Sequence, residues 1–271
     1  MSPGLSGAGG IPRINVLGVG VSALNLSLAV SEVQRWIDGG RREYACITGM
    51  HGVVESLHEE PLRRIHNRAG LVTPDGMPMA WLLWWHGHHD ADRVCGAEFM
   101  GAVIQHGLAR GWRHYLYGTK PETLALLEER LKARFPNIEI VGRLSPPFRE
   151  LTPEEDEQIV ADINASGADI VWVGLSTPKQ ERWMDAHRGR LQAHALMGVG
   201  AAFDFHAGTV QQAPRFIQRS GFEWLYRLAS EPRRLWRRYM TGIPTFMVQI
   251  LLQKTGLRRF PAEWESGRAW S

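Results

Sequence analysis

The stretch that decides the fold is Asp169-Ile-Val-Trp-Val-Gly-Leu-Ser-Thr-Pro-Lys-Gln-Glu-Arg-Trp183. Ile170 to Val173 is a short apolar, β-branched run, which is typical of a strand buried on both faces of a sheet. Gly174 ends the run. Thr177, Pro178 and Gln180 then follow with the spacing of an N-cap, a first helical residue and a capping box. The order strand, glycine turn and helix N-terminus predicts a parallel α/β sheet, in which such turns hold anionic ligands.

The same unit recurs on both sides of this stretch. Upstream, His114 to Tyr117 leads through Gly118 and Thr119 into a helix, and Thr119 and Glu122 again have capping-box spacing. Downstream, Ala195 to Asp204 is typical of a strand that enters a turn containing Gly198 and Gly200. Tight turns between strands and helices need glycine whatever they bind. Three of them in one domain favour a nucleotide or another phosphate-bearing ligand at the carboxyl ends of the strands.

The composition is that of an ordinary globular protein. The chain has 271 residues, of which 44% are hydrophobic and 22% charged, and its formal net charge is +3. This length is enough for one large or two small domains with a buried core. Cys46 and Cys95 match no metal-binding spacing and indicate a reducing compartment without disulfides. The polar lead has no signal-peptide core, and no apolar run is long enough to span a membrane. We therefore expect a cytoplasmic protein whose membrane contact is peripheral.

A dinucleotide site is an alternative near the N-terminus. Ile14 to Val19 is typical of a strand, and Gly18-Val-Gly20 resembles part of the dinucleotide fingerprint. The third glycine position is Ala23, and no ribose-binding acid follows the second strand, Tyr44 to Ile47. A nucleotide-dependent oxidoreductase with a Rossmann site at Gly18 and Gly20 is therefore the less favoured hypothesis.

A carboxylate follows the next predicted strand. An amphipathic helix from about Val53 to Ala69 leads into Leu71-Val-Thr-Pro-Asp75-Gly76. Asp-Gly is a common turn pair, and the carboxyl end of a strand is also where an α/β enzyme places a general base, so both roles stay open for Asp75. Asp90-Ala-Asp92 resembles a metal motif. Because it falls in a polar stretch and not after a strand, a solvated loop is favoured there.

Residues 211–271, called the basic segment below, differ from the rest of the chain. Arginines are interleaved with aromatic and aliphatic side chains, and few acids accompany them. Helical segments of this kind meet membrane surfaces, nucleic acids or diphosphates, and each arginine near an anionic bilayer contributes roughly 1 kcal/mol. A helical pair with solvated arginines is the plain alternative. The arginines interleaved with these side chains are Arg215, Arg219, Arg227, Arg233, Arg234, Arg237 and Arg238.

Several ordered motifs together resemble the WecG/TagA/CpsF glycosyltransferases (glycosyltransferase family 26), from Ile14 to about Phe246. They are Thr73-Pro-Asp75-Gly76, Arg93-Val-Cys-Gly96, Tyr117-Gly-Thr-Lys-Pro121, Gly174-Leu-Ser-Thr-Pro-Lys-Gln-Glu181, Gly198-Val-Gly-Ala-Ala-Phe-Asp204, Glu223-Trp-Leu-Tyr-Arg227 and Glu231-Pro-Arg-Arg-Leu-Trp-Arg-Arg238. The resemblance implies an α/β fold of Rossmann-like parallel sheets flanked by helices, the GT-E fold of that family. We expect a flexible lead at residues 1–12, a catalytic domain at 13–210 and a helical, membrane-associating appendage at 211–271.

The resemblance also implies an activity. It is the inverting, metal-independent transfer of a sugar (N-acetylmannosamine, its uronic acid, or glucose) from a UDP-sugar to a polyprenyl-diphosphate-linked sugar. The transfer occurs at the inner face of the cell membrane, in cell-surface polysaccharide synthesis, without a cofactor. Asp75 matches the proposed general base, and Thr48, Arg93 and Gln180 match residues around the active site. The residues expected at the UDP-sugar are Gly118, Thr119, Lys120, Gly174, Pro178, Lys179, Gly198, Gly200 and Asp204, and those at the acceptor diphosphate or the membrane are Arg227, Arg233, Arg234, Arg237 and Arg238.

The departures from the family pattern affect which sugar we expect and leave the expected type of reaction unchanged. Pro74 replaces a common alanine, Met50 replaces an asparagine of many members, and Pro147 lies where they have a Gly-Tyr-Phe segment. His51 is a candidate for the missing sugar contact. The donor, the acceptor, the linkage and the choice between monomer and homo-oligomer stay open. A nucleic-acid-binding module would leave the glycine turns and Asp75 without a role, so we expect no nucleic-acid partner.

Overall fold

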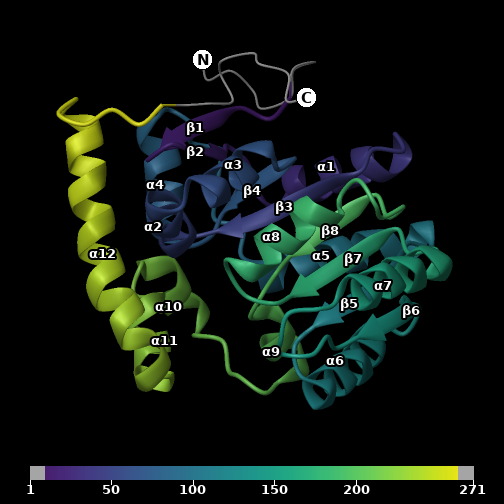
Figure 1. Ribbon diagram of the computed structural model, residues 1–271. Helices are drawn as coiled ribbons and strands as arrows, with labels where there is room; N and C mark the ends of the chain where they lie inside the picture. The colour runs from purple at the N-terminus through teal and green to yellow at the C-terminus, as the bar shows by residue number, and fades with distance from the viewer. Residues whose placement is uncertain (1–9, 262–271) are drawn as a thin grey trace. The chain divides into compact units, whose positions relative to one another are not determined.

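The computed structural model describes residues 10–261, without the side chain of Arg234, so most of the predicted lead and the end of the basic segment lie outside it. Within the described residues, six strands form one sheet in the order β4-β3-β8-β7-β5-β6, and β1 and β2 form a separate pair (Figure 1). The predicted α/β fold with a parallel sheet flanked by helices is confirmed. The chain divides into two compact units: unit 1 contains residues 1–25, 47–95 and 213–271, and unit 2 contains residues 26–46 and 96–212.

Unit 2 holds the parallel strands on which the glycine turns lie. Residue 170 pairs with residue 114 on one side and with residue 195 on the other, so the carboxyl ends of β5, β7 and β8 are in register. β7 is buried along its apolar length, as its β-branched run predicts. The elements are α1 (Leu26–Asp38), β3 (Glu43–Thr48, of which 43–46 belong here), α5 (Gly96–Gly107), the 3₁₀ turn Leu108–Arg110, β5 (Arg113–Gly118), α6 (Pro121–Arg134), β6 (Glu139–Leu144), α7 (Pro153–Ser166), β7 (Ile170–Gly174), α8 (Lys179–His187), β8 (Ala195–Gly198) and α9 (Ala202–Ala207).

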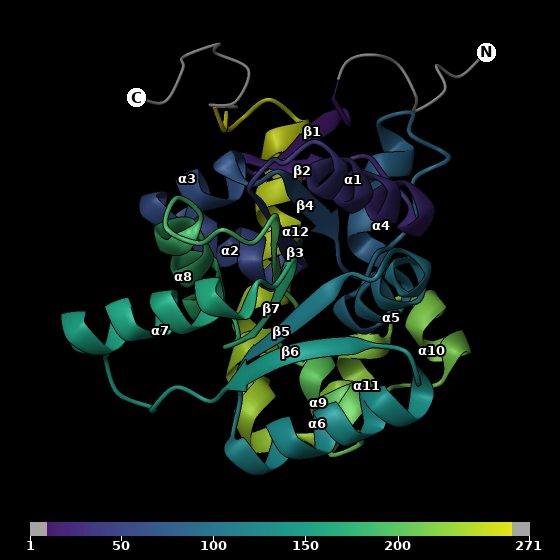
Figure 2. The same ribbon diagram turned by 90° about the vertical axis from the view of Figure 1, so that its right-hand side faces the viewer.

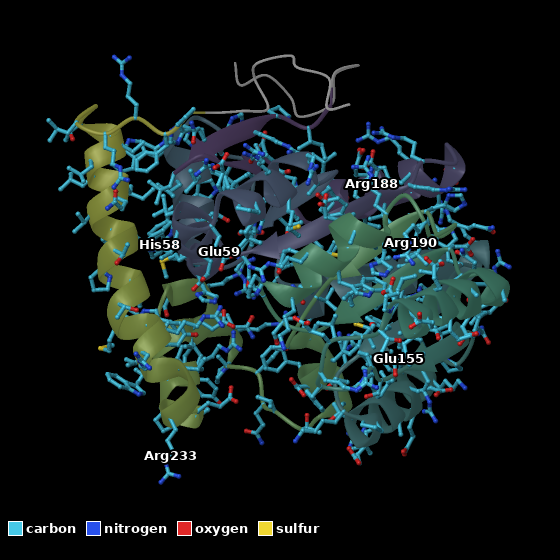
Figure 3. All side chains as sticks on the ribbon, in the orientation of Figure 1. His58, Glu59, Glu155, Arg188, Arg190 and Arg233 are labelled. Atoms are coloured by element: carbon cyan, nitrogen blue, oxygen red, sulfur yellow. The ribbon has the colours of Figure 1, made fainter. Side chains whose placement is uncertain are left out.

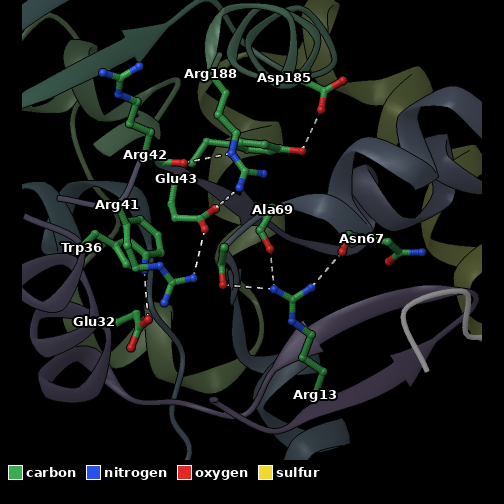
Figure 4. A network of polar contacts seen from close by, with 12 residues as sticks. Arg13, Glu32, Trp36, Arg41, Arg42, Glu43, Asn67, Ala69, Asp185 and Arg188 are labelled. Carbon is green, nitrogen blue, oxygen red and sulfur yellow. Dashed lines mark hydrogen bonds and ion pairs between the residues drawn. The ribbon is translucent and has the colours of Figure 1, made fainter. Parts of the chain in front are cut away.

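Helices cover both faces of the sheet in unit 2. α5, α6 and α9 lie on one face, and α7 and α8 lie on the other (Figure 2). α7 begins with a capping box, in which the Glu155 N–H donates to Thr152 Oγ1 and the Thr152 N–H donates to Glu155 Oε2. At the start of β3, Glu43 accepts hydrogen bonds from Arg41 at 3.0 Å and forms an ion pair with Arg188 at 2.8 Å (Figure 4). The ion pair with Arg188 ties the start of β3 to the end of α8.

Unit 1 is built from three separate parts of the chain. Its elements are β1 (Arg13–Val16), β2 (Val19–Ser22), the end of β3, α2 (Met50–His58), α3 (Glu60–Arg68), β4 (Leu71–Pro74), α4 (Met77–Trp85), α10 (Arg215–Ser220), α11 (Glu223–Ser230) and α12 (Pro232–Lys254). The guanidinium of Arg13 donates to the carbonyl oxygens of Asn67, Ala69 and Gly70 at the end of α3 (Figure 4). α12 packs along α2 (Figure 1), and Gln253 donates to the Asn15 carbonyl and accepts from the Leu17 N–H.

Two predictions for unit 1 are wrong. Ile14 to Val19 is not one strand, because Leu17 and Gly18 have φ values of +54° and +90° and turn the chain into an antiparallel hairpin. Gly18-Val-Gly20 therefore leads into β2 and not into a helix, which removes the turn geometry that a Rossmann dinucleotide site requires. The predicted single helix from Val53 to Ala69 is two helices, with a break at Glu59 immediately before the first turn of α3, where Pro61 lies.

Two predicted helix caps in unit 2 are also wrong. α6 has Lys120 at its N-cap position and α8 has Pro178 there, and neither end shows a side-chain cap. Thr119 has a φ of +52°, and its N–H donates a hydrogen bond to the carbonyl oxygen of Gly174 on the neighbouring strand. The Thr177 hydroxyl donates a hydrogen bond to the Glu181 carboxylate instead of capping the helix.

Candidate functional site

In unit 1, the ends of β3 and β4 bring Thr48 and Asp75 together. The Asp75 N–H donates to the Thr48 carbonyl oxygen at 3.1 Å. A Cβ at Gly49 would lie 3.0 Å from the Asp75 carbonyl oxygen and 3.8 Å from Oδ2, so the glycine leaves room for the carboxylate. Thr48 is 2% exposed, and its Oγ1 has no hydrogen-bond partner among the described residues. The two predicted site residues thus form one corner, with a buried hydroxyl beside a half-exposed carboxylate.

Asp75 is held from both sides of the chain. Before it, the buried Pro74 ends β4 and its carbonyl oxygen accepts from the Val94 N–H at 2.8 Å. After it, Gly76 has a φ of +89° and lies at the N-cap position of α4. This backbone geometry fixes Asp75 at the carboxyl end of a strand, where a general base is expected. It also ties the loop that carries Arg93 to the same corner.

Arg93 is the most enclosed charged group of this corner. Its side chain is 4% exposed, and it donates to Glu223 of α11 at 2.8 Å and to Gln218 of α10. A third contact goes to Cys95 Sγ at 3.5 Å. A buried guanidinium needs such partners because desolvation disfavours its charge. Arg93 therefore joins the Asp75 corner to the helices of the basic segment.

The pKa of Glu223, the acid that pairs with Arg93, is influenced by the charge of Asp75. The pKa of Glu223 is raised, first by burial and then by the negative charge of Asp75, while Arg93 and Arg227 oppose the rise. Glu223 and Gln218 were not predicted as site residues. The available signals did not define a role: Glu223 begins the motif Glu223-Trp-Leu-Tyr-Arg227 and is one of few acids in an arginine-rich segment, but nothing local points to a partner 130 residues earlier in the chain.

His51 lies near the same corner, in the first turn of α2. Its pKa is lowered to about 4, first by burial and then by the positive charge of Arg238 on α12. The ring is therefore neutral at pH 7, and it is suited to exchange hydrogen bonds with a sugar hydroxyl rather than to pair with a phosphate as a cation.

The arginines of the basic segment separate into inward and outward groups. Arg238 is half-buried beside His51, while Arg233 and Arg237 are exposed (Figure 3, Arg233 labelled). Arg227 is half-buried on α11, near Glu223. The Arg234 side chain lies outside the described structure. The arginines predicted for the acceptor or the membrane thus belong to two environments.

In unit 2, three glycine turns meet at the ends of neighbouring strands. The Thr119 N–H donates to the Gly174 carbonyl oxygen at 3.1 Å, and the N–H groups of Val199 and Gly200 donate to the Val173 carbonyl oxygen at 3.0 and 3.3 Å. Gly118 has a φ of +123°, and a Cβ there would lie 2.6 Å from the Gly174 carbonyl oxygen. The predicted residues Gly118, Thr119, Gly174, Gly198 and Gly200 are therefore brought together in one unit.

Gln180 links α8 to the third turn. It is 2% exposed, and its Nε2 donates to the Gly198 carbonyl oxygen at 3.0 Å and to Glu181 Oε1 at 3.1 Å. A Cβ at Gly200 would lie 3.3 Å from Gln180 Oε1, and this oxygen has no hydrogen-bond partner within the described part of the chain. The amide thus presents an unused acceptor beside the turn.

The remaining predicted donor residues surround these turns. Lys120 precedes α6, Pro178 precedes α8, and Lys179 is the first residue of α8; both lysines are exposed. Asp204 lies in the first turn of α9 and accepts from the Thr209 hydroxyl through its carbonyl oxygen at 3.2 Å. Two helix N-termini with a lysine each, next to glycine turns, are suited to bind phosphate.

Comparison with known proteins gives the family of the chain. Residues 14–260 match the glycosyl transferase WecG/TagA/CpsF family. The chain belongs to this family. The match covers both units, including the Asp75 corner, the three glycine turns and α10 to α12. Membership of the WecG/TagA/CpsF family identifies the protein as a glycosyltransferase of cell-surface polysaccharide synthesis.

Proposed function

We propose that this glycosyltransferase moves a hexosyl group from a UDP-sugar to a polyprenyl-diphosphate-linked sugar, with inversion and without a metal ion. The observation that carries the donor class is the group of three glycine turns at the carboxyl ends of β5, β7 and β8, each followed by the N-terminus of a helix, which is where parallel α/β sheets bind phosphate groups. Lys120 and Lys179, at the starts of α6 and α8, supply positive charge for the leaving UDP.

Asp75 is the proposed general base. Its carboxylate takes the proton of the acceptor hydroxyl as that oxygen bonds to the anomeric carbon, and the bond from this carbon to the β-phosphate oxygen breaks, so that UDP leaves with the electron pair. The Thr48 hydroxyl, which has no hydrogen-bond partner within residues 10–261, and the neutral His51 ring are suited to orient sugar hydroxyl groups beside it.

The test is acceptor-dependent release of UDP, measured with a short-chain polyprenyl-diphosphate-GlcNAc acceptor, a panel of UDP-sugars and EDTA. We expect release with one donor. Asp75→Asn should lower the rate by roughly 10²–10⁴ while UDP still binds. Asp90→Asn, which changes an exposed loop carboxylate, is the matched control and should keep full activity. No UDP binding by the wild-type protein would refute the donor class, and a fully active Asp75→Asn variant would remove Asp75 from the mechanism.

We further propose that α12 rests on an anionic membrane surface. Trp236, Met240, Met247 and Leu251 are 54%, 49%, 60% and 62% exposed, and helical spacing puts them on one face. Arg233 and Arg237 lie at one end of this face, and at the other end, about 30 Å away at ~1.5 Å per residue, Lys254 lies over the Trp85 ring. No helix in the described part of the chain is long and apolar enough to cross a membrane. An apolar face with cationic ends is typical of a helix that lies in the interface.

Point substitutions test this contact without disturbing unit 1. Met247→Glu with Leu251→Glu should lower binding to vesicles that contain anionic lipid, because carboxylates replace apolar groups at the surface. Phe148→Glu makes the same change on unit 2, at a side chain that is 80% exposed, and should leave binding unchanged. Equal binding by all three proteins would contradict the assignment of α12.

A further inference from the structure

Glu223 is joined to the Asp75 corner through an enclosed set of hydrogen bonds. Arg93 donates to Glu223 Oε2 at 2.8 Å and to Gln218 Oε1, and Gln218 in turn donates from Nε2 to the Ala213 carbonyl oxygen at 2.6 Å. The bond to Ala213 fixes the orientation of the Gln218 amide, so its oxygen faces Arg93. The Arg93 side chain is 4% exposed and that of Glu223 is 25% exposed.

We propose that Glu223 is a positioning residue of the transferase reaction, which holds the Arg93 guanidinium in place and, through its own charge, sets the pH at which Asp75 accepts the acceptor proton. This rests on the proposed function of Asp75. It assigns to the first residue of α11 a task in the chemistry, beyond any contact of the basic segment with membrane or diphosphate.

The electrostatic part follows from the groups that face Glu223. They are Asp75 after β4, Arg93 before α5 and Arg227 one turn further along α11. The charge of Asp75 raises the pKa of Glu223, and a Coulomb interaction acts equally on both partners, so an ionised Glu223 also disfavours ionisation of Asp75. Arg93 limits this repulsion because it donates to Glu223 and neutralises its charge.

A second ion pair joins the same two segments and provides a control. Asp92 and Arg219 are the neighbours of Arg93 and Gln218, and their side chains meet at 3.2 Å while they are 36% and 73% exposed. A surface pair of this kind contributes little energy, and its field is screened by solvent. If the enclosed contact matters only as a tie between the segments, Asp92→Asn and Glu223→Gln should act alike.

The experiment compares Glu223→Gln, Gln218→Glu and Asp92→Asn with the wild-type protein. Glu223→Gln keeps an acceptor for Arg93 and removes a negative charge, so the acid limb of the kcat/KM profile should move to lower pH. Gln218→Glu adds a negative charge beside Arg93, so the limb should move to higher pH. Asp92→Asn should leave it in place. A merely structural role would lower activity in both buried variants without moving the limb in opposite directions.

Carboxyl ¹³C NMR of Asp75 gives a readout that does not need activity. In Glu223→Gln its titration midpoint should fall, and in Asp92→Asn it should equal that of the wild type. Failure of the wild-type protein to release UDP would overturn the proposed function while the midpoints still decide the role of Glu223. An unchanged midpoint in Glu223→Gln, or the same fall in Asp92→Asn, would overturn the inference. Circular dichroism and UDP binding verify that each variant is folded.

Discussion

His114 makes the stability of unit 2 depend on pH. It lies on β5, 1% exposed, and its Nδ1 accepts the indole N–H of Trp172 at 3.1 Å. Burial lowers its pKa from 6.5 to about 4, against a smaller opposing effect of Asp169. In the folded protein the ring therefore stays neutral down to about pH 4, because a proton on Nδ1 would face the indole proton and have no water around it.

In the unfolded chain His114 has its ordinary pKa of about 6.5, so below that pH the ring is protonated. It must then lose this proton for the chain to fold. The stabilisation is present above pH 6.5 and is lost as the pH falls towards 4. At ~1.36 kcal/mol for each tenfold difference in proton affinity, the full loss is about 3 kcal/mol, of which about 2 kcal/mol is lost by pH 5. This is a large part of the roughly 5–15 kcal/mol by which a domain is stable. His51 in unit 1, whose pKa is also about 4, adds a similar loss there.

The assay is urea denaturation at pH 7.5 and pH 5.0, with His114→Asn as the test variant. Asparagine keeps a hydrogen-bond acceptor for Trp172 and removes the titration. Between the two pH values the wild type should lose about 2 kcal/mol more of its free energy of unfolding than the variant does. His89→Asn, at an exposed loop position, should behave as the wild type. An identical pH dependence of wild type and His114→Asn would refute the assignment of a buried neutral ring.

Three further substitutions test the turns and caps of unit 2. Gly118→Ala puts a Cβ 2.6 Å from the Gly174 carbonyl oxygen at a φ of +123°. It should lower the free energy of unfolding by about 3 kcal/mol or more and weaken UDP binding. Gly40 has a φ of +63°, and a Cβ there would meet no described atom within 4 Å, so Gly40→Ala should lower the free energy of unfolding by only about 1–2 kcal/mol. Thr152→Ala removes the capping box of α7 and should lower the free energy of unfolding by about 1 kcal/mol while kcat stays unchanged. Gln180→Leu leaves the Gly198 carbonyl without its donor; it should cost about 1–3 kcal/mol and raise the KM for the UDP-sugar, and an unchanged KM would separate Gln180 from the donor.

The parts of the fold that sequence reasoning predicted correctly are those decided by local residues. The β-branched run Ile170 to Val173 forms a buried strand because few other arrangements bury it on both faces. The capping box of α7 also depends on local residues, because the Glu155 carboxylate accepts a hydrogen bond from the Thr152 N–H within one turn. Thr119 and Thr177 have equally suitable spacing, yet neither caps its helix. The Thr119 N–H donates to the Gly174 carbonyl oxygen, and the Thr177 hydroxyl donates to the Glu181 carboxylate. A bond to the neighbouring strand at Thr119, and a bond to a side chain of α8 itself at Thr177, thus replace caps that are worth about 1 kcal/mol each.

The site shows the same limit at longer range. Asp75 and Thr48 were predicted because motif resemblance singles them out, and each follows a recognisable strand. The partners of Arg93 were not predicted, because hydrophobic periodicity carries no information on which polar side chains meet across 125 and 130 residues. The hairpin at Gly18 was missed for a local reason: an apolar run with one glycine fits both one strand and two.

The interleaved make-up of unit 1 has a consequence for the order in which the protein forms on the ribosome. Leu17 is translated 236 residues before Gln253, its hydrogen-bond partner, which is a delay of roughly 10–50 s at about 5–20 residues per second. All residues of unit 2 have been polymerised by residue 212, while unit 1 still awaits residues 213 onward. The nascent polypeptide therefore completes the unit with the glycine turns first. The apolar face of α12 is made only afterwards, so during most of translation the chain carries no surface of that kind that could bind lipid.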